Sequence, residues 1–583
     1  MYPVVSIGTQ DFEYIRKNHY FYVDKTDFIH EWWENGDTVT LITRPRRFGK
    51  TLTMSMLELF FSNQYAGRTE LFEGLSVWED EKYRQLQGSW PVIFISFAGI
   101  KGNTYEEIRE SMIQTIIDLY AKYRYLLESD ALNQQEKEYF DYVKPGMSDT
   151  VAAMALHRLA ICMYRYYGKK VIILLDEYDT PLHEAYAYDF WDKLIPFISK
   201  LFNCTFKTNL YMERSVLTGI TRVSNESVFS DMNNLEVVMT TSCKYESAFG
   251  FTEAEVCDAL EVFGLSDQLG VVRYWYDGFC FGNRKDIYNP WSITKYLDSG
   301  KFGTYWANTS SNKLVGKLIQ EGSPELKMDA EVLLAGNAIQ RSLEEEIVFD
   351  QLDESESSVW SLLLATGYLR AEHPLASHEN GKTENEKSES EKSGNEESES
   401  EKSENEYVLS LTNLEIKKEF RKIIQRWFAN PSARYNDFIK ALLLEDVDFM
   451  NRYMNQVALQ TFSFFDTGKQ PSGETDPERF YHGFVLGLIV DLADRYLIKS
   501  NRESGLGRYD VVLEPLRSDL KAYVLEFKVF NPAKEKNLDE TVKNALSQIE
   551  KMKYDTELLA RGISADRISH YGFAFEGKHV LIG

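Results

Sequence analysis

The stretch from Thr38 to Phe61 constrains the fold of this chain more than any other. It begins with apolar residues from Val39 to Thr43, which predict a short buried strand. A tight basic turn follows and ends in Gly49-Lys50-Thr51, after which apolar residues recur at helical spacing. A strand, a basic turn and a helix in direct succession predict an α/β fold with the turn at a helix N-terminus.

Gly49-Lys50-Thr51 matches the second half of a P-loop, in which backbone N–H groups hold phosphate oxygens at a helix N-terminus. In such a loop the lysine reaches the β- and γ-phosphates, and the threonine hydroxyl binds Mg²⁺. The full pattern has its first glycine at position 44, where this chain has Arg44. The alternative is a basic turn that only caps a helix. Arg47, in the same turn, is a further candidate for nucleotide binding.

A second motif downstream favours the nucleotide-binding interpretation. The apolar run from Val171 to Leu175 ends in the paired acids Asp176 and Glu177. A buried parallel strand of this kind delivers its acids at the carboxyl edge of a sheet, beside the P-loop. Asp176 would hold the Mg²⁺ shell and Glu177 would polarise the attacking water. The alternative is that the two acids cap a helix.

The remaining strands of this region complete a nucleotide-binding sheet. The run Pro91 to Phe97 is apolar throughout, and the run Ser215 to Thr221 ends in polar residues. Thr218 or Thr221 lies where a polar sensor would contact the γ-phosphate, and Arg222 is either a charge stabiliser or an ordinary surface arginine. Strands that alternate with helices imply a parallel sheet covered on both faces.

The middle of the chain changes character twice. Residues 250–340 have a helical pattern with aromatic-rich turns, which predicts a lid or small helical domain behind the nucleotide site. Residues 377–406 hold 11 Glu against 4 Lys and no apolar residue, so we expect this segment to be disordered. Because 407–411 resumes as a strand that could pair with 367–370, the acidic segment is interpreted as an extended hairpin loop.

The C-terminal region carries a different chemistry. A strand from Ala522 to Val529 is predicted, on which Glu526 and Lys528 face one side while Phe527 faces the other. A carboxylate and an ammonium on an otherwise apolar strand cost several kcal/mol unless they are paired or bound to a metal. The alternative to a catalytic role is therefore a structural Glu–Lys pair.

Asp510 lies on the preceding predicted strand, from Gly507 to Leu513. Together with Glu526 it could bind Mg²⁺ through two carboxylates, while Lys528 positions the attacking water or stabilises a pentacovalent phosphate. Glu478 begins an apolar helix and is a candidate accessory acid.

Composition narrows the function classes. The chain of 583 residues has room for about four domains and carries a formal net charge of −25, which argues against coating nucleic acid by bulk electrostatics. It has no run of about 18 apolar residues and no signal-peptide pattern, so no membrane association is expected. Its five cysteines form no CxxC pair and suggest reduced core thiols of a cytoplasmic protein.

Taken together, the motifs resemble a bacterial and archaeal family that joins an AAA-ATPase-like N-terminal domain to a C-terminal PD-(D/E)xK nuclease-superfamily domain. The matching stretches cover nearly the whole chain outside 377–406 and are TRPRRFGKT, LLDEYDTP, LTGITRVSNESVFSDMNNL, WYDGF, IYNPWSI, ERFYHGFVLGL, SNRESGLGRYDVVLEP, VLEFKV and ALSQIEKMKY. The resemblance implies phosphate and Mg²⁺ binding by Gly49, Lys50 and Thr51, with Asp176 and Glu177 as the Walker B pair. It implies a catalytic core of Asp510, Glu526 and Lys528, with Glu478 as accessory acid.

Two positions bear on this resemblance. Arg44 is shared with the family's RPRRFGK pattern, which leaves nucleotide affinity and hydrolysis rate open. Related nucleases often carry Gln with Tyr four residues later, on one face of a helix. Here Met552 occupies that place after Gln548, and Tyr554 falls about 240° round the helix, so we expect Gln548 and not Tyr554 to face the site.

The expected architecture is an α/β chain with a P-loop parallel sheet in 1–245, a helical lid or connecting region in 246–376, a disordered acidic loop in 377–406, a helical connector in 407–470 and a nuclease-like α/β domain in 471–583. The expected function is an ATP-binding, ATP-hydrolysing protein coupled to a Mg²⁺-dependent nuclease, with DNA as the favoured nucleic acid. One alternative is a nucleotide-binding regulatory or scaffold protein with a silent nuclease fold. Another is an ATPase switch whose C-terminal domain binds nucleic acid without cutting it. A homo-oligomer is left open.

Overall fold

The structure is a computed structural model that describes residues 2–223, 228–229, 232–306, 318, 324–344, 356–372, 406–428, 435–461, 477–489, 492, 495–504, 507–517 and 520–583. The chain forms two compact units, one of Met1–Val315 with Ala338–Glu419 and one of Gly316–Asn337 with Phe420–Gly583. The acidic segment 377–406 lies outside the described residues, except that Glu406 begins a strand. In the described part of the chain, no helix is both long enough and apolar enough to cross a membrane.

The first unit is built on a five-stranded sheet with the order β2-β3-β4-β1-β5, in which every neighbouring pair is parallel. Its strands are β1 (Val39–Thr43), β2 (Val92–Ser96), β3 (Val171–Asp176), β4 (Met212–Gly219) and β5 (Leu235–Val238). The apolar residues of β1 and β3 are buried on both sides, as a central parallel strand requires. The predicted parallel sheet is therefore confirmed.

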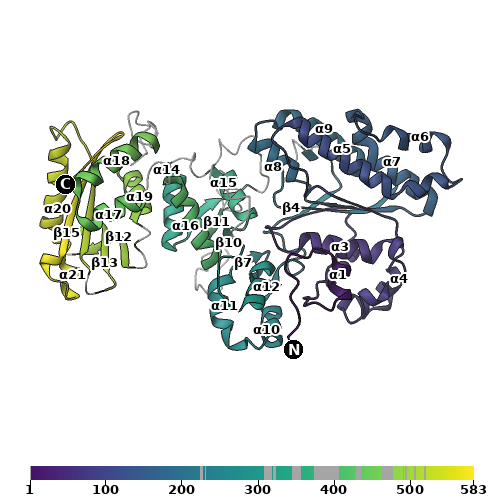
Figure 1. Cartoon of the computed structure of the whole chain (residues 1–583), viewed down its shortest axis with the longest axis horizontal. Coiled ribbons are helices and arrows are strands. Elements are labelled where there is room, and N and C mark those ends of the chain that lie inside the picture. Colours follow the sequence, from purple (N-terminus) through teal and green to yellow (C-terminus); the bar gives the residue numbers. More distant parts are fainter. Residues whose placement is uncertain are drawn as a thin grey trace, which may run out of the picture. The chain divides into compact units, whose positions relative to one another are not determined.

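Helices cover both faces of this sheet (Figure 1). On one face lie α1 (Phe12–Lys17), α3 (Lys50–Phe61) and α4 (Glu81–Leu86), and on the other lie α5 (Tyr105–Lys122), α7 (Asp149–Tyr167) and α9 (Trp191–Phe206). The shorter helices α2 (Asp27–Asn35), α6 (Gln134–Tyr142) and α8 (Thr180–Ala187) complete this part of the unit. Every strand connection within the sheet is thus long enough to cross from one strand to a parallel neighbour.

The rest of the first unit contains more strand than the sequence pattern predicted. An antiparallel sheet of β6 (Phe251–Thr252), β8 (Arg284–Tyr288) and β7 (Phe279–Phe281) lies among α10 (Glu253–Val262), α11 (Leu269–Tyr276) and α12 (Pro290–Ser299). The aromatic-rich segments that were expected to be turns between helices supply these short strands, which are too brief to give a period-2 signal.

A third sheet closes the first unit. It has the order β10 (Leu369–Glu372), β11 (Glu406–Leu411) and β9 (Ile339–Ser342), with α15 (Glu356–Ala365) beside it. Leu369 pairs with Leu411 in antiparallel register, which confirms the predicted pairing of these two segments. The helix α16 (Leu414–Phe428) follows directly, and its residues from Phe420 onward belong to the second unit.

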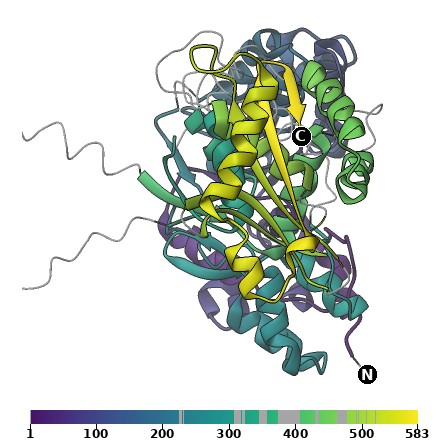
Figure 2. The same ribbon diagram turned by 90° about the vertical axis from the view of Figure 1, so that its left-hand side faces the viewer.

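The second unit is a five-stranded mixed sheet with the order β12-β13-β14-β15-β16. Its strands are β12 (Tyr496–Ser504), β13 (Gly507–Pro515), β14 (Ala522–Val529), β15 (Ile568–Glu576) and β16 (His579–Ile582). Only β14 and β15 pair in parallel, and the crossover between them contains α20 (Leu538–Met552) and α21 (Thr556–Ala560). Figure 2 shows the yellow α20 lying across the strands.

Alternate residues of these strands face two different cores. Val511, Tyr523, Leu525 and Phe527 pack in a core with α17 (Tyr435–Leu444), α18 (Val447–Thr461) and α19 (Pro477–Ile489). Val512, Ala522 and Val524 pack in a smaller core with α20 and α21. A further helix, α14 (Pro324–Ala335), contacts α19. Phe527 therefore faces away from Glu526 and Lys528, as its place on the strand predicts.

The cysteines are all free. Cys162 is buried, but Cys243 is exposed, so the expectation that all five are core thiols is wrong for Cys243. It lies in the turn after β5, outside the regular elements whose apolar pattern identifies core positions.

Candidate nucleotide and nuclease sites

The loop between β1 and α3 has the backbone form of a phosphate-binding turn. Gly49 is the N-cap of α3 with a φ of 85°, and Arg47 has a φ of 65°. A positive φ is rare for an arginine, because its Cβ crowds the backbone there. The two left-handed residues curl the chain immediately before Lys50, so that the loop ends at the N-terminus of the helix.

Lys50 is held over this loop. Its side chain is buried, and Nζ donates to the carbonyl oxygens of Arg44 at 2.7 Å and Pro45 at 2.8 Å. Burial lowers the pKa of Lys50 to about 8, although the carboxylates of Glu177, Asp179 and Asp176 act in the opposite direction. The loop's own carbonyls thus hold the ammonium where a P-loop lysine contacts phosphate.

Asp176 joins the two nucleotide-binding motifs. Its Oδ2 accepts from Thr51 Oγ1 at 2.9 Å, and its Oδ1 accepts from Thr218 Oγ1 at 2.5 Å. Thr51 lies in the first turn of α3, after β1, and Asp176 ends β3; these two strands are not neighbours, because β4 lies between them. Thr218 at the end of β4 fills the space between them. A carboxylate and a hydroxyl in contact are a donor set that suits the oxygen-preferring Mg²⁺.

Glu177 lies at the same edge of the sheet. It has a φ of 53°, and its Oε2 accepts from Thr180 Oγ1 at 3.1 Å. Its backbone N–H donates to Thr218 Oγ1 at 3.4 Å. Strained backbone of this kind occurs most often where a side chain must point in one functional direction.

The two sensor candidates separate in the structure. Thr218 contacts Asp176, whereas Thr221 donates its N–H and hydroxyl to Asp179, at 2.9 and 3.0 Å. Asp179 is buried, and it also pairs with His183 at 3.3 Å. Burial raises the pKa of Asp179, but the charge and hydrogen bond of His183 and the backbone N–H groups outweigh it and hold that pKa below its usual range.

Asp179 was not singled out from the sequence. Its signal was present in the quoted stretch LLDEYDTP, where it stands two residues after Glu177. It ties the turn after β3 to the turn after β4, because both Ile220 N–H and Thr221 N–H donate to its Oδ2.

Arg44 occupies the place of the missing glycine and has a structural role. The side chain is completely buried, and Nη1 donates to the carbonyls of Thr43, Val238 and Met239. Its guanidinium also lies 4.6 Å from the ring centroid of Phe281. Burial lowers the pKa of Arg44 to about 9. The residue thus fastens the start of the loop to the end of β5.

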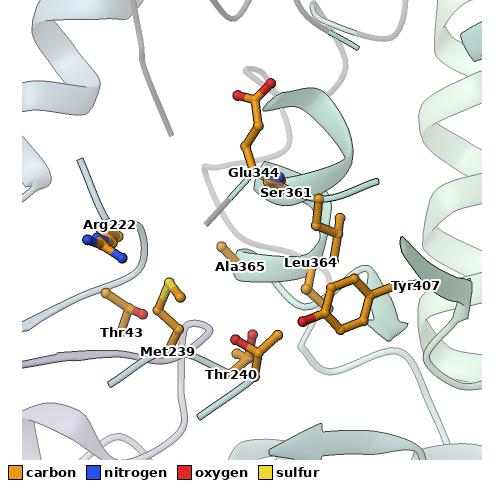
Figure 3. Close-up of a pocket in the computed structure, with 11 residues that line it drawn as sticks. Thr43, Arg222, Met239, Thr240, Glu344, Ser361, Leu364, Ala365 and Tyr407 are labelled. Atoms are coloured by element: carbon orange, nitrogen blue, oxygen red, sulfur yellow. The ribbon is translucent and has the colours of Figure 1, made fainter. Parts of the chain in front are cut away.

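The contacts described for Arg222 and Arg47 are with groups other than Lys50, Thr51 and Asp176. Arg222 lines a cavity of about 40 Å³ with Thr43, Met239 and Thr240 on one side and Glu344, Ser361, Leu364 and Tyr407 on the other (Figure 3). This volume suits a few water molecules and not a nucleotide. The guanidinium of Arg47 lies 3.9 Å from the ring centroid of Trp291, and its Nη1 donates to the carbonyl of Tyr305.

The second site begins where β13 and β14 part. Their pairing stops at Val511 and Leu525, and directly beyond it Asp510 Oδ2 accepts from the backbone N–H of Phe527 at 2.8 Å. Glu526 is buried, and its Oε1 accepts from Gln548 Nε2 of α20. The carboxylate of Asp510 thus takes the place of a strand-to-strand hydrogen bond.

Glu526 and Lys528 both lie close enough to Asp510 to affect its pKa. Burial raises the pKa of Asp510, against the N–H of Phe527, the charges of His482 and Lys528 and a hydrogen bond with Glu526. A half-buried and a buried carboxylate in contact fit a divalent cation, and Mg²⁺ uses one or two protein carboxylates with water. Across the described ranges, no group of three or more His, Cys, Asp or Glu side chains is arranged to hold a metal ion.

Tyr554 does reach the site, contrary to the helical-wheel expectation. Gln548 Nε2 donates to Tyr554 Oη at 3.1 Å as well as to Glu526. The expectation was wrong because α20 ends at Met552, and Lys553 has a left-handed φ of 54° that turns the chain back. The geometry of a continuous helix therefore does not apply to Tyr554.

His482 is a residue that the sequence reasoning missed. Its Nε2 lies 3.1 Å from both Asp510 O and Ser500 Oγ, and the ring is buried. The available signal was its position four residues after Glu478, which places the two on one face of a helix. Glu478 belongs to α19, and its side chain lies outside the described residues.

Comparison with known families matches each site to one family model. Residues 6–229 match the model of a predicted AAA-ATPase, and residues 476–583 match that of the PD-(D/E)XK nuclease superfamily. Both domain types named by the resemblance are confirmed. The nucleotide-site residues fall within the first match, and Asp510, Glu526 and Lys528 fall within the second.

The chain is also similar to an uncharacterized protein in the vnfD 5′ region of Azotobacter chroococcum mcd 1, with 27% identity over 372 residues. The matched region covers 62% of this chain and 63% of that protein. The chain thus spans less than two thirds of the length of the curated relative that it matches.

Proposed function

We propose that this chain binds and hydrolyses ATP in its N-terminal region and cleaves phosphodiester bonds of nucleic acid, with DNA as the favoured substrate, in its C-terminal region. The proposed domains are a P-loop domain in 1–245, a lid or connecting region in 246–376, an acidic loop in 377–406, a connector in 407–470 and a nuclease domain in 471–583. We also propose a cytoplasmic location, where cysteines stay reduced, as the five free thiols of this chain are.

In the nucleotide site, we assign a separate role to each side chain. Lys50 neutralises charge on the β- and γ-phosphates, and Glu177 orients a water for attack. Thr51 and Asp176 are the residues that would hold Mg²⁺, and Thr218 fixes the Asp176 carboxylate through its hydroxyl. Mg²⁺ supplies charge neutralisation at the phosphates when bound.

In the second site, Asp510 and Glu526 are the residues that would hold Mg²⁺, which acts as a Lewis acid on the phosphate when bound. Lys528 is on the same face of β14 as Glu526 and stabilises charge that develops on the phosphate oxygens. Gln548 orients Glu526, and Tyr554 orients Gln548. The single observation that carries the nuclease proposal is the contact of the Asp510 and Glu526 carboxylates where β13 and β14 part.

The decisive experiment incubates the purified protein with plasmid and single-stranded DNA in Mg²⁺ or Mn²⁺, with and without ATP. Lys528→Ala is compared with Lys551→Ala, which removes an exposed lysine of α20. Cleavage by the native protein and by Lys551→Ala, lost in Lys528→Ala, supports the proposal. Cleavage that persists in Lys528→Ala contradicts it.

The second candidate is a nucleotide-binding regulatory or scaffold protein with a silent nuclease fold. Arg44 favours it, because this buried arginine replaces a glycine that lets the loop approach phosphate closely. Nucleotide binding without turnover, together with no metal-dependent cleavage under any condition above, would establish this candidate.

A further inference from the structure

The outer side of the nucleotide-binding loop is held by residues far along the chain. The carbonyl oxygen of Arg46 accepts from Trp306 Nε1 at 3.1 Å and from Asn289 Nδ2 at 3.3 Å. Trp306 and Asn289 are both buried. The loop is therefore fixed at its middle by two donors from the segment that follows β8, in addition to the bonds that Arg44 makes at its start.

Trp306 is in turn held by one carboxylate. Glu415 Oε1 accepts from the backbone N–H groups of Tyr305 and Trp306, the latter at 2.6 Å. Its Oε2 accepts from Ser292 Oγ of α12 at 2.7 Å. Glu415 is buried, and its carboxylate accepts from these three donors. The tyrosine carbonyl on the same segment also accepts from Arg47 and Trp291.

Glu415 is in the first turn of α16, which begins at Leu414. The chain of contacts thus runs from Arg46 through Trp306 to Glu415 and ends on a helix whose later residues belong to the second unit. A buried carboxylate is costly unless it is paired or hydrogen-bonded, and its three donors offset that cost for Glu415. Through its bonds to the N–H groups of Tyr305 and Trp306, Glu415 holds the segment whose Trp306 side chain contacts the loop.

We propose that Glu415 is a positioning residue of the nucleotide site, which fixes the Arg46 carbonyl through Trp306 and links the shape of the loop to the first turn of α16. This rests on the proposed nucleotide binding. A loop whose shape is set in this way binds phosphate without reorganisation. By reciprocity, nucleotide that tightens the loop also orders the first turn of α16.

The test compares three variants of the full chain. Glu415→Ala removes the acceptor for three donors, whereas Glu415→Gln keeps one acceptor oxygen for the two N–H groups and an amide that donates to Ser292. Tyr288→Phe is the matched control, because it removes a partly buried hydrogen bond to Glu253 in the same region and leaves the described contacts of the loop in place. Binding of a fluorescent ATP analogue with Mg²⁺ is measured for each, with Lys50→Ala as a non-binding reference.

We expect Glu415→Ala to weaken binding about fivefold or more, since a lost buried hydrogen-bond set propagates to the loop. Glu415→Gln and Tyr288→Phe should bind within about twofold of the native protein. Hydrogen exchange of residues 414–419, with and without nucleotide, is the second measurement. A residue that only stabilises the fold would not change the effect of nucleotide on this exchange. Nucleotide should slow this exchange in the native protein and in Glu415→Gln, and not in Glu415→Ala.

Native-like binding by Glu415→Ala, or an equal loss in Tyr288→Phe, overturns the role of Glu415. If Glu415→Ala does not fold, Trp306→Phe decides, because it keeps the ring against Tyr368 and removes only the donor to Arg46. Unchanged binding by Trp306→Phe then overturns the inference. A native protein that binds no nucleotide overturns the proposed function itself, which is a different result.

Discussion

The two sites handle buried charge in different ways. In the nucleotide site, Asp176 accepts from two hydroxyls, and Lys50 donates to two carbonyls of its own loop. In the second site, the half-buried carboxylate of Asp510 and the buried carboxylate of Glu526 share one face of the sheet, and burial raises the pKa of Asp510 despite its hydrogen bonds. In the first site burial disfavours the charge of a cation, Lys50, whereas in the second it disfavours the charge of a carboxylate, Asp510, which a bound cation would offset.

This difference fits the two kinds of phosphate chemistry that we propose for the chain. A preformed loop provides fixed dipoles for a ligand that brings its own charge. Two adjacent carboxylates, one of them with a pKa raised by burial, provide affinity for a cation that binds from solution. Each of the following predictions either separates the two sites further or shows that they behave alike.

The largest effect should come from the proposed water-orienting acid. Glu177→Gln should lower the ATP hydrolysis rate about 10²- to 10⁴-fold, because the amide cannot accept the proton of the attacking water. Nucleotide binding and DNA cleavage should be retained. Steady-state phosphate release, measured beside equilibrium nucleotide binding, checks this expectation. Equal loss of hydrolysis and binding would show that Glu177 shapes the site instead.

Mg²⁺ without nucleotide should stabilise the second unit selectively. At about 100 times its dissociation constant, a bound cation adds about 2.7 kcal/mol to the free energy of unfolding. Hydrogen exchange at β14 should slow accordingly, and exchange at β3 should not. Asp510→Asn should remove the effect. Equal slowing of both strands would mean that the two sites recruit the cation alike.

The pH dependence of stability should show whether hydrogen bonds alone offset the cost of burying the Glu415 carboxylate. Burial raises its pKa to about 7, against the donors Trp306, Ser292 and Tyr305. The folded state then holds a proton that the unfolded chain releases near pH 4.5, so the free energy of unfolding falls by about 2 kcal/mol as pH rises from 4.5 to 7. Glu415→Gln should flatten this slope in chemical unfolding curves. An unchanged slope would assign it to other groups.

The smallest effect concerns the stability of the metal-free protein. Asp510→Asn removes a costly buried charge and keeps the acceptor for Phe527 N–H, so it should raise the free energy of unfolding by about 1 kcal/mol. Asp176→Ala leaves the hydroxyls of Thr51 and Thr218 without their acceptor and should lower it by about 1 to 2 kcal/mol. Chemical unfolding in chelator measures both. Destabilisation by Asp510→Asn would contradict the contrast between the sites.

The sequence predicted the parts of the fold that depend on local pattern. The apolar runs that end at Thr43 and Asp176 identified two strands of the parallel sheet, and alternation placed Glu526 and Lys528 opposite Phe527. These signals depend on spacing within one element, which a single sequence displays directly.

What the sequence could not show depends on contacts between distant segments or on one backbone angle. The choice of Thr218 over Thr221 follows from β4 lying between β1 and β3, which is a matter of sheet order. The approach of Tyr554 to Gln548 follows from the left-handed Lys553, a conformation that lysine rarely adopts. The burial of Arg44 depends on Val238 and Met239, nearly 200 residues away.

Arg44 also has a consequence for the dynamics of the loop. Its partners are backbone carbonyls and aromatic rings, so its release would expose a bare cation to a dry interior before water could reach it. Local opening at this end of the loop is therefore as costly as the opening of the sheet that supplies those carbonyls. We therefore expect the amide protons at the start of the loop to exchange more slowly than those of exposed turns in the same unit.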